Sequence, residues 1–557
     1  MNRRISFILL IALLVGVLAT PASVFAEDIK DPSDIAKVLI YTENGVDIPA
    51  NKSKVNCEIY IVDEKGGAYE TVHGENCTVN VRGNSTSSAY KKPYNIKFDS
   101  KTDVLGMGKN KKWSLLANCY DKTLIRNAVV MDFARELGVP YTPDYRFVDV
   151  YVNDKLHGSY VIIDSIEVGE TRVDIDVDNN EYLLELDWNP QDPDCYYFYS
   201  WNESMKFAIN EPELEDLSET QKKYVTDLVS KAENALRSGS IAEVEKYFDI
   251  ESMAKFYLTL EFFRNIDVAT SSTRFHIKNG KIYGGPVWDF DLSSGNYNVD
   301  YYGKGTLEQQ FHATSMKWFR ELVKYDAFQS LVNESFLAMQ DTIVNLYTDN
   351  TLGLNKIDTL IDKYGTSFDR NNNEAGWSPN VVHHASMQLE RHPDKTYEEN
   401  VEFYRGWLRE RNEWLLEEWG LTSFIELGDG ADITLDGYYI YGTTDKTTAK
   451  DIISQIATKG ASVIGGSELS EGDIVPNGSI VTVGGVSYAV ILKGDVNGDA
   501  KIDQYDYLLV MREYFDTVTL DEIQFRAADI NGDGIINQYD YILVKRHYFK
   551  TYDIYKK

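Results

Sequence analysis

The sequence predicts an α+β protein of several domains. Strand patterns dominate the first third of the chain, and helical patterns dominate from residue 213 to 420. The composition changes at Gly428, and one 12-residue pattern then occurs twice near the C-terminus. We therefore expect a large domain over residues 27–425, a small β-rich spacer module with one helix over 428–490, and an all-α module over 491–557.

The first 26 residues have the features of a secretory signal peptide. Arg3 and Arg4 precede the apolar run Ile5–Leu18, and Val24-Phe-Ala26 ends the segment with a small-x-small pattern. The apolar run is too short for a comfortable membrane span, and no later segment offers one. We expect cleavage after Ala26 and a secreted, extracellular mature chain.

The chain is strongly acidic. It holds 56 Lys+Arg and 87 Asp+Glu, for a net charge of −31. This balance argues against nucleic acid and anionic membranes as partners, because phosphate binding requires a basic surface. It is compatible with a basic polypeptide substrate, and equally with simple solubility.

The elements of the large domain follow from apolar alternation, helical periodicity and turn signals. Helices are expected from Glu213 to Phe263 and from 305 to 420, and a hairpin is expected around Asn279-Gly280. The earlier part should hold one helix at Thr123–Leu137 and strands at Lys37–Thr42, Glu58–Val62, Cys77–Arg82, Tyr94–Phe98, Trp113–Ala117, Phe147–Val152, Gly158–Ile163 and Tyr182–Leu186.

The four cysteines carry no zinc-type spacing and no recognisable histidine context, so we expect neither a zinc site nor a catalytic thiol. Export permits disulfides. Cys57 and Cys77 lie in neighbouring predicted strands and are the favoured pair.

Acidic residues flank the predicted hairpin on both sides. Asp267 precedes it at the end of a helix, and Asp289 and Asp291 follow it. This order delivers three carboxylates to one end of the hairpin. Phosphoryl transfer from a nucleotide uses such a set, because one carboxylate orients the acceptor hydroxyl while others hold magnesium on the phosphates. The alternatives are a turn or capping role for Asp267 and surface positions for the other two.

Upstream residues offer contacts for the phosphates. Lys97, on a predicted strand, is a candidate for the lysine that pairs with them. Arg82 and Asn84 either bind phosphate or tie their loop into the domain. Protein kinases present a helix, a catalytic Asp, a hairpin and then Asp-Phe-Gly in that order, and Asp289-Phe-Asp291 takes the last place here.

An ordered set of motifs resembles the spore coat protein H (CotH) kinase family of atypical kinase-like proteins. The resemblance covers about Lys37–Trp419 and implies a two-lobed kinase-like fold, ATP and Mg²⁺ as cofactors, and phosphate transfer to serines of proteins. The motifs are Val81-Arg-Gly-Asn-Ser85, Lys91-Lys-Pro-Tyr-Asn-Ile-Lys97, Leu105-Gly106, Lys112-Trp-Ser-Leu-Leu-Ala-Asn118, Arg126-Asn127, Gly158-Ser-Tyr160, Tyr182-Leu-Leu-Glu-Leu-Asp187 and Pro286-Val-Trp-Asp-Phe-Asp291.

The same resemblance implies roles for single residues. Asp267 would be the catalytic Asp, Asp289 and Asp291 the metal-binding acids, and Lys97 a phosphate contact. The segment after Glu185 would line the adenine pocket. The chain departs from the family after Asp267, where many members have a hairpin Asn and this sequence reads Ser-Ser-Thr-Arg-Phe.

The two C-terminal copies place oxygen-bearing side chains at loop positions 1, 3, 5, 9 and 12. Calcium takes six to eight oxygen ligands, and a 12-residue loop of this spacing wraps it, with position 7 serving through its backbone carbonyl. We therefore expect two Ca²⁺ ions. The ligands would be Asp495, Asn497, Asp499, Lys501, Asp503 and Asp506 in the first loop, and Asp529, Asn531, Asp533, Ile535, Asn537 and Asp540 in the second.

Each loop leads into a predicted helix, Tyr505–Tyr514 or Tyr539–Tyr548, but no helix signal precedes the first loop, and position 12 is Asp where a standard EF-hand has Glu. With the repeat spacing of 34 residues, these features resemble a type I dockerin over Lys493–Phe549. Dockerins attach enzymes to the cohesins of a cellulosome scaffold. The alternative is a calcium-stabilised helix pair without a partner.

Loop positions 10 and 11 help to select the cohesin in dockerins. Both copies read Gln-Tyr here, as Gln504-Tyr505 and Gln538-Tyr539. The resemblance therefore implies a cohesin-binding surface with pseudo-two-fold symmetry, able to bind in either of two orientations.

Three functions are compatible with the sequence. The first is an exported, scaffold-docked kinase, and the second is a kinase-like module that binds without catalysis. The third is a carbohydrate-active enzyme delivered to polysaccharide, in which Asp267 and Asp289 would form a glycosidase pair. The Asp-Phe-Asp segment behind a hairpin is typical of a metal site and favours the first.

Overall fold

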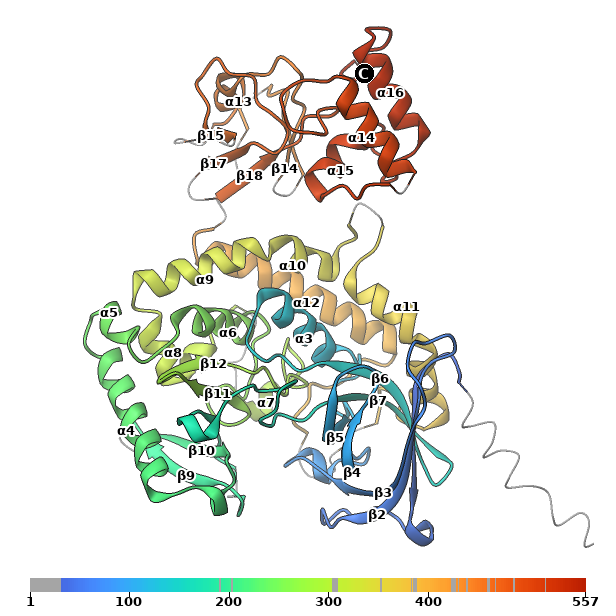
Figure 1. Ribbon diagram of the computed structural model, residues 1–557, viewed down its shortest axis with the longest axis vertical. Helices are drawn as coiled ribbons and strands as arrows, with labels where there is room; N and C mark the ends of the chain where they lie inside the picture. Colours follow the sequence, from blue (N-terminus) through green and yellow to red (C-terminus); the bar gives the residue numbers. More distant parts are fainter. Residues whose placement is uncertain are drawn as a thin grey trace, which may run out of the picture. The chain divides into compact units, whose positions relative to one another are not determined.

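The computed structural model describes residues 32–557, apart from 190–191, 202–203, 303–308, 351–352, 382, 384–387, 422–426, 429, 437–438, 458–460, 466, 484–485, 516 and 557 (Figure 1). The predicted signal peptide lies outside these residues. The fold is mixed α and β, as expected. The chain forms two compact units, one of residues up to Phe336 with Lys356–Arg411, the other of Leu337–Asn355 with Asn412–Lys557.

A closed seven-stranded barrel opens the first unit, in the order β1-β2-β3-β4-β5-β7-β6. All neighbours are antiparallel except β1 and β6, whose parallel pairing closes the barrel. Alternate residues such as Val79, Ile96 and Trp113 fill its apolar core, as strand alternation requires. The strands are β1 (Lys37–Thr42), β2 (Val55–Val62), β3 (Val72–Val81), β4 (Tyr94–Asp103), β5 (Lys109–Leu116), β6 (Tyr145–Val152) and β7 (Lys155–Asp164).

A five-stranded sheet in the order β12-β11-β8-β10-β9 forms a second part of this unit (Figure 1). The predicted hairpin is present as β11 and β12, and Asn279 (φ 51°) and Gly280 (φ 72°) form its turn. The strands are β8 (Tyr182–Leu186), β9 (Tyr196–Ser200), β10 (Met205–Glu211), β11 (Thr273–Lys278) and β12 (Lys281–Gly284).

Helices accompany this sheet. Helix α4 begins at the capping box of Ser218 and Gln221, and Asp249 caps α6. Residues 263–272 join the end of α6 to the first strand of the hairpin. The first unit contains α3 (Arg126–Leu137), α4 (Glu219–Leu236), α5 (Ile241–Val244), α6 (Ile250–Phe262), α7 (Val299–Tyr302), α8 (Lys317–Leu322), α11 (Lys356–Asp369) and most of α9 (Asp326–Ala338) and α12 (Tyr397–Glu418). Helix α10 (Gln340–Tyr347) belongs to the second unit.

The second unit contains a six-stranded sheet in the order β13-β14-β18-β17-β15-β16 and helix α13, around a core that includes Ile440, Ile452 and Tyr488. The strands are β13 (Thr434–Asp436), β14 (Tyr439–Tyr441), β15 (Ser462–Gly465), β16 (Ser467–Glu468), β17 (Ile480–Val483) and β18 (Val486–Val490). Helix α13 (Ala449–Ser454) is the helix expected in this module.

The C-terminal region holds α14 (Gln504–Tyr514), α15 (Glu522–Ala528) and α16 (Gln538–Tyr548). Helices α14 and α16 follow the two repeated loops, as expected. Helix α15 was not expected, because the short run after Asp521 carries little apolar periodicity. Its capping box, formed by Asp521 and Gln524, is the signal that marks its start.

The structure places Cys57 directly opposite Cys77 across β2 and β3, but both are free thiols, so the disulfide favoured from the sequence is not formed. Among the described residues, no helix has the length and apolar character needed to cross a membrane.

Candidate functional site

A cleft of about 540 Å³ in the first unit brings together the acidic residues singled out in the sequence. Its walls come from the β3–β4 loop, the ends of β5 and β8, the segment between α6 and β11, and the segment after β12. Predicted residues that line it are Arg82, Asn84, Glu185, Asp267, Asp289 and Asp291.

Asp267 is held by the short turn that joins α6 to the hairpin. Its backbone N–H donates to Oδ1 of Asn265 (2.9 Å), and the Thr270 hydroxyl donates to its Oδ1 (3.3 Å). Burial, followed by the nearby negative charge of Asp289, raises the pKa of Asp267 to about 7. A carboxylate with a pKa near neutrality is suited to accept a proton at physiological pH.

The Asp289–Asp291 segment is fixed by side chains from two other segments. Asn265 Nδ2 donates to the carbonyl of Asp289 (3.0 Å), and the Ser272 hydroxyl donates to Oδ2 of the same residue (3.1 Å). From α3, Asn127 Oδ1 accepts the backbone N–H of Phe290 (2.8 Å). These bonds hold Asp289 with its backbone in the left-handed region (φ 63°), a conformation that Asp tolerates better than most residues.

Asp291 is buried. Burial and the charge of Asp289 raise the pKa of Asp291 well above its usual range. Neighbouring carboxylates in such surroundings are costly without a cation. Carboxylate oxygens are also the ligands that magnesium prefers, so the donor chemistry here fits Mg²⁺.

Two arginines supply positive charge to the cleft. Arg274 on β11 pairs with Glu185 on β8 (3.0 Å), its cross-strand neighbour. The guanidinium groups of Arg82 and Arg274 lie 5.2 and 5.9 Å from the centroid of the Trp288 ring. Burial lowers the pKa of Arg82, while the charge of Asp289 opposes that shift.

The structure does not bring Lys97 to the cleft. This residue lies on β4 between Ile96 and Phe98, which are buried in the barrel core, so its own side chain is on the opposite face and is exposed. Strand alternation therefore sends Lys97 to solvent. The cation beside Glu185 is Arg274.

Sequence reasoning missed Asn265, Ser272 and Arg274. Asn265 and Ser272 were visible as polar neighbours of Asp267, but nothing in the sequence showed that both would bond to Asp289. Arg274 could not be assigned because its pairing with Glu185 depends on the register of β11 against β8, two strands far apart in the sequence.

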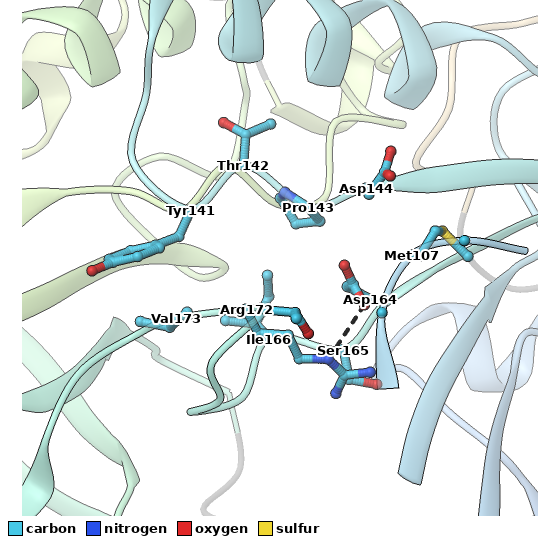
Figure 2. Close-up of a pocket in the computed structure, with 13 residues that line it drawn as sticks. Met107, Tyr141, Thr142, Pro143, Asp144, Asp164, Ser165, Ile166, Arg172 and Val173 are labelled. Atoms are coloured by element: carbon cyan, nitrogen blue, oxygen red, sulfur yellow. Dashed lines mark hydrogen bonds and ion pairs between the residues drawn. The ribbon is translucent and has the colours of Figure 1, made fainter. Parts of the chain in front are cut away.

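A second cavity, of about 400 Å³, lies elsewhere in the first unit and contains none of the predicted catalytic residues (Figure 2). The β4–β5 turn, the segment before β6 and the segment after β7 line it. Figure 2 shows the Asp164 carboxylate beside Arg172, with an Nε–Oδ1 distance of 3.3 Å. Because that guanidinium also bonds Glu167 and the carbonyl of Lys112, it is part of the internal support of the barrel end.

The two C-terminal loops share one internal bonding pattern. In each, the position-12 carboxylate accepts backbone N–H groups from positions 2, 3 and 9, through Asp506 in the first loop and Asp540 in the second. Both carboxylates are fully buried. Burial raises the pKa of Asp506 to about 6 and raises that of Asp540 above its usual range.

The oxygen donors of both loops fit a hard divalent cation such as Ca²⁺. In this structure their side chains bond chiefly to loop backbone. Across the described part of the chain, no three His, Cys, Asp or Glu side chains are already gathered into a metal-binding group. Loop positions 10 and 11, which are Gln504-Tyr505 and Gln538-Tyr539, begin α14 and α16. They are exposed, with Tyr505 59% and Tyr539 63% accessible.

The acidic cleft beside a hairpin and the duplicated oxygen-rich loops define a two-part protein, with a kinase-like site in one part and a docking-type module in the other. Residues 79–415 match the family model described as CotH kinase protein, and residues 493–548 match the dockerin type I domain. The first match spans more than half of the chain, so this chain belongs to the CotH kinase family. No curated protein matches it.

The dockerin implies a cohesin as partner and an extracellular, cellulosome-associated protein. Both family resemblances inferred from the sequence motifs are thereby confirmed.

Proposed function

We propose that this protein is an exported kinase that transfers the γ-phosphate of ATP to serine hydroxyls of a protein substrate, while its dockerin holds it on a cohesin of a scaffold. The observation that carries the proposal is the convergence of Asp267, Asp289 and Asp291 on one cleft together with Arg82 and Arg274. In this proposal, the barrel and the helix-rich part that border the cleft serve as the two lobes of a kinase.

Asp267 is the proposed catalytic residue. Its pKa, raised to about 7, leaves a substantial fraction of the carboxylate ionised at neutral pH, while its basicity is high enough to accept the proton of a serine hydroxyl. The Thr270 hydroxyl and the Asn265 amide fix its position. A fixed Asp267 would orient the serine hydroxyl that accepts the phosphate, and such positioning is a main contribution of a protein to phosphoryl transfer.

Asp289 and Asp291 are the proposed holders of Mg²⁺. When bound, the ion would neutralise charge on the transferring phosphate. The protein's contribution is to hold both acids on one rigid segment, through Asn127, Asn265 and Ser272.

Arg82 and Arg274 are the proposed phosphate contacts, with Asn84 at the rim of the cleft and Glu185 orienting Arg274. Arginine suits this role because its planar guanidinium binds phosphate oxygens in a bidentate manner. Lys97 has no part in the proposal because it is exposed on the barrel.

For the second unit we propose two Ca²⁺ ions, one in each repeated loop, and cohesin binding through Gln504-Tyr505 or Gln538-Tyr539. The predicted signal peptide would export the chain. The loop donors support the calcium assignment, and the exposed tyrosines support the docking surface.

The kinase proposal is tested with purified protein, Mg²⁺ and γ-labelled ATP, measuring label on the protein itself and on a serine-containing protein substrate. We expect Asp267→Asn to lower transfer at least about 100-fold, the usual cost of losing a general base. The matched control is Asp99→Asn, an exposed acid on β4 that is not among the residues lining the cleft and should keep full activity. Equal labelling by Asp267→Asn and the unmodified protein would refute the assignment.

The same preparation separates the other candidate functions. A kinase-like module that only binds proteins predicts no shift of melting temperature with Mg²⁺ and a non-hydrolysable ATP analogue. A glycosidase predicts sugar release from cellulose or xylan, abolished by Asp267→Asn. Either result, in the absence of phosphate transfer, would replace the kinase proposal.

A further inference from the structure

The two repeated loops differ in how their first carboxylate is held. In the second loop, Asp529 accepts three backbone N–H groups, all from that loop: Gly532 (2.9 Å), Asp533 (3.2 Å) and Gly534 (3.1 Å). This ligand position is therefore supported entirely from within the repeat.

In the first loop, one of the three supports comes from outside the repeat. Asp495 accepts the N–H groups of Asp499 and Ala500 (3.0 Å each), and its third donor is the backbone N–H of Asn477 (3.0 Å). Asn477 lies just before β17, in the module that precedes the dockerin. The Asn477 N–H bonds Oδ2 of Asp495, whereas the donor found only in the second loop, the position-4 N–H of Gly532, bonds Oδ1 of Asp529. Asp495 is fully buried, so each of these bonds is shielded from water.

Asn477 is itself fixed by the dockerin through its side chain. Its Oδ1 accepts the N–H of Leu492 (3.1 Å), and its Nδ2 donates to the carbonyl of Ile523 on α15 (3.4 Å). A Cβ atom on Gly498 would lie 3.2 Å from the carbonyl oxygen of Asn477. Only glycine at position 4 therefore leaves the Asn477 backbone room to approach Asp495 without displacement.

A second contact joins the same two modules. The Arg526 guanidinium of α15 lies 3.8 Å from the centroid of the Tyr439 ring and donates to the Tyr441 hydroxyl (3.1 Å). Both tyrosines belong to β14. The spacer and the dockerin thus share polar contacts at a calcium loop and at the helix before the other loop, within one compact unit.

We propose that Asn477 is a positioning residue for the first calcium site, so that this site is completed by the spacer module whereas the second site is autonomous. The inference rests on the proposed calcium binding. Loss of a group that orients a metal ligand typically weakens metal binding 10- to 100-fold. By linkage, calcium in the first loop must strengthen the hold of the dockerin on Asn477 by the same factor.

The test measures calcium affinity of the full chain by competition with a chelator, using single-site backgrounds. Asp533→Ala leaves only the first loop, and Asp499→Ala leaves only the second. Asn477→Ala keeps the backbone N–H that donates to Asp495 but removes the two side-chain bonds, to Leu492 and Ile523, that place this N–H against the loop. We expect the loss of these bonds to weaken calcium binding about tenfold or more in the Asp533→Ala background and to leave it unchanged in the Asp499→Ala background.

The matched control is Thr448→Ala, which removes the capping box of α13, a set of bonds that Thr448 makes with Asp451 of the same module. It should change neither affinity. Equal effects of Asn477→Ala on both sites, or an effect of Thr448→Ala as large as that of Asn477→Ala on the first site, would overturn the inference. No calcium binding by either single-site background would instead overturn the calcium assignment itself.

A second measurement keeps Asn477 unchanged and covers the case in which Asn477→Ala fails to fold. Hydrogen exchange of the backbone N–H of Asn477, which donates to Asp495, should slow about tenfold or more when calcium is added to the Asp533→Ala chain. In the Asp499→Ala chain its rate should not respond to calcium. An identical response in both chains would contradict a specific link to the first loop.

Discussion

Lys91 is a buried cation in the loop between β3 and β4. It is 2% exposed, its Nζ donates to the carbonyl of Ser159 (2.6 Å), and it lies 4.7 Å from the centroid of the Tyr160 ring. Burial lowers the pKa of Lys91 to about 7. The folded protein therefore favours the neutral amine in a pH range where the unfolded chain keeps it protonated.

This shift gives the stability a defined pH dependence. Between pH 7 and about 10 the unfolded state binds more protons at Lys91, so the free energy of unfolding rises with pH, by at most about 1.4 kcal/mol per unit from this group. We expect Lys91→Met to reduce that slope and the exposed Lys97→Met to leave it unchanged. Denaturant unfolding at pH 7, 8 and 9 measures both, and an unaltered slope in Lys91→Met would count against the shift.

The hairpin, α3 and most barrel strands were predictable because their apolar periodicity or turn chemistry is local. Strands β9 and β10 were not, since a run such as Tyr-Tyr-Phe-Tyr shows no alternation of polarity. Barrel closure through β1 and β6 depends on parallel pairing of residues more than 100 positions apart, which no local pattern reveals. For the same reason the sequence led to Lys97 as the phosphate contact: the place of Arg274 beside Glu185 depends on the register of β11 against β8.

Helix α4 offers a test at the scale of one element. Ser218 caps it, accepting the N–H of Gln221 while that side chain bonds back. Ser240 occupies the same position before α5 but makes no capping bond through its side chain. We expect Ser218→Ala to lower the free energy of unfolding by about 1 kcal/mol and Ser240→Ala to change it by only a few tenths.

Thermal or urea unfolding followed by circular dichroism would show this difference. The comparison isolates the cap, because both substitutions remove the same hydroxyl from the same helix position. Similar losses in the two variants would mean that the capping box contributes nothing measurable to α4.

At the scale of the whole molecule, the two proposed kinds of ligand bind different units: Mg²⁺ with ATP binds the first, and Ca²⁺ binds the second. Every residue that lines the acidic cleft belongs to the first compact unit, and both repeated loops belong to the second. A ligand stabilises the structure that it binds by about 2.7 kcal/mol at 100 times its Kd. Each ligand should therefore stabilise one unit selectively.

Differential scanning calorimetry tests this selectivity. We expect two transitions, one raised by Mg²⁺ with a non-hydrolysable ATP analogue and the other raised by Ca²⁺. Removal of calcium with a chelator should lower only the second. A single transition that responds equally to both ligands would show that the two units unfold together.

The left-handed backbone of Asp289 decides which substitution can remove the activity of the cleft while the protein stays bound to a scaffold. Alanine at that position would remove a carboxylate and also add about 1–2 kcal/mol of backbone strain, so an alanine scan would mix loss of chemistry with loss of shape. Asparagine accepts the same φ of 63° and nearly the same volume. Asp289→Asn is thus the substitution of choice for an inert cargo that still occupies its place on the scaffold.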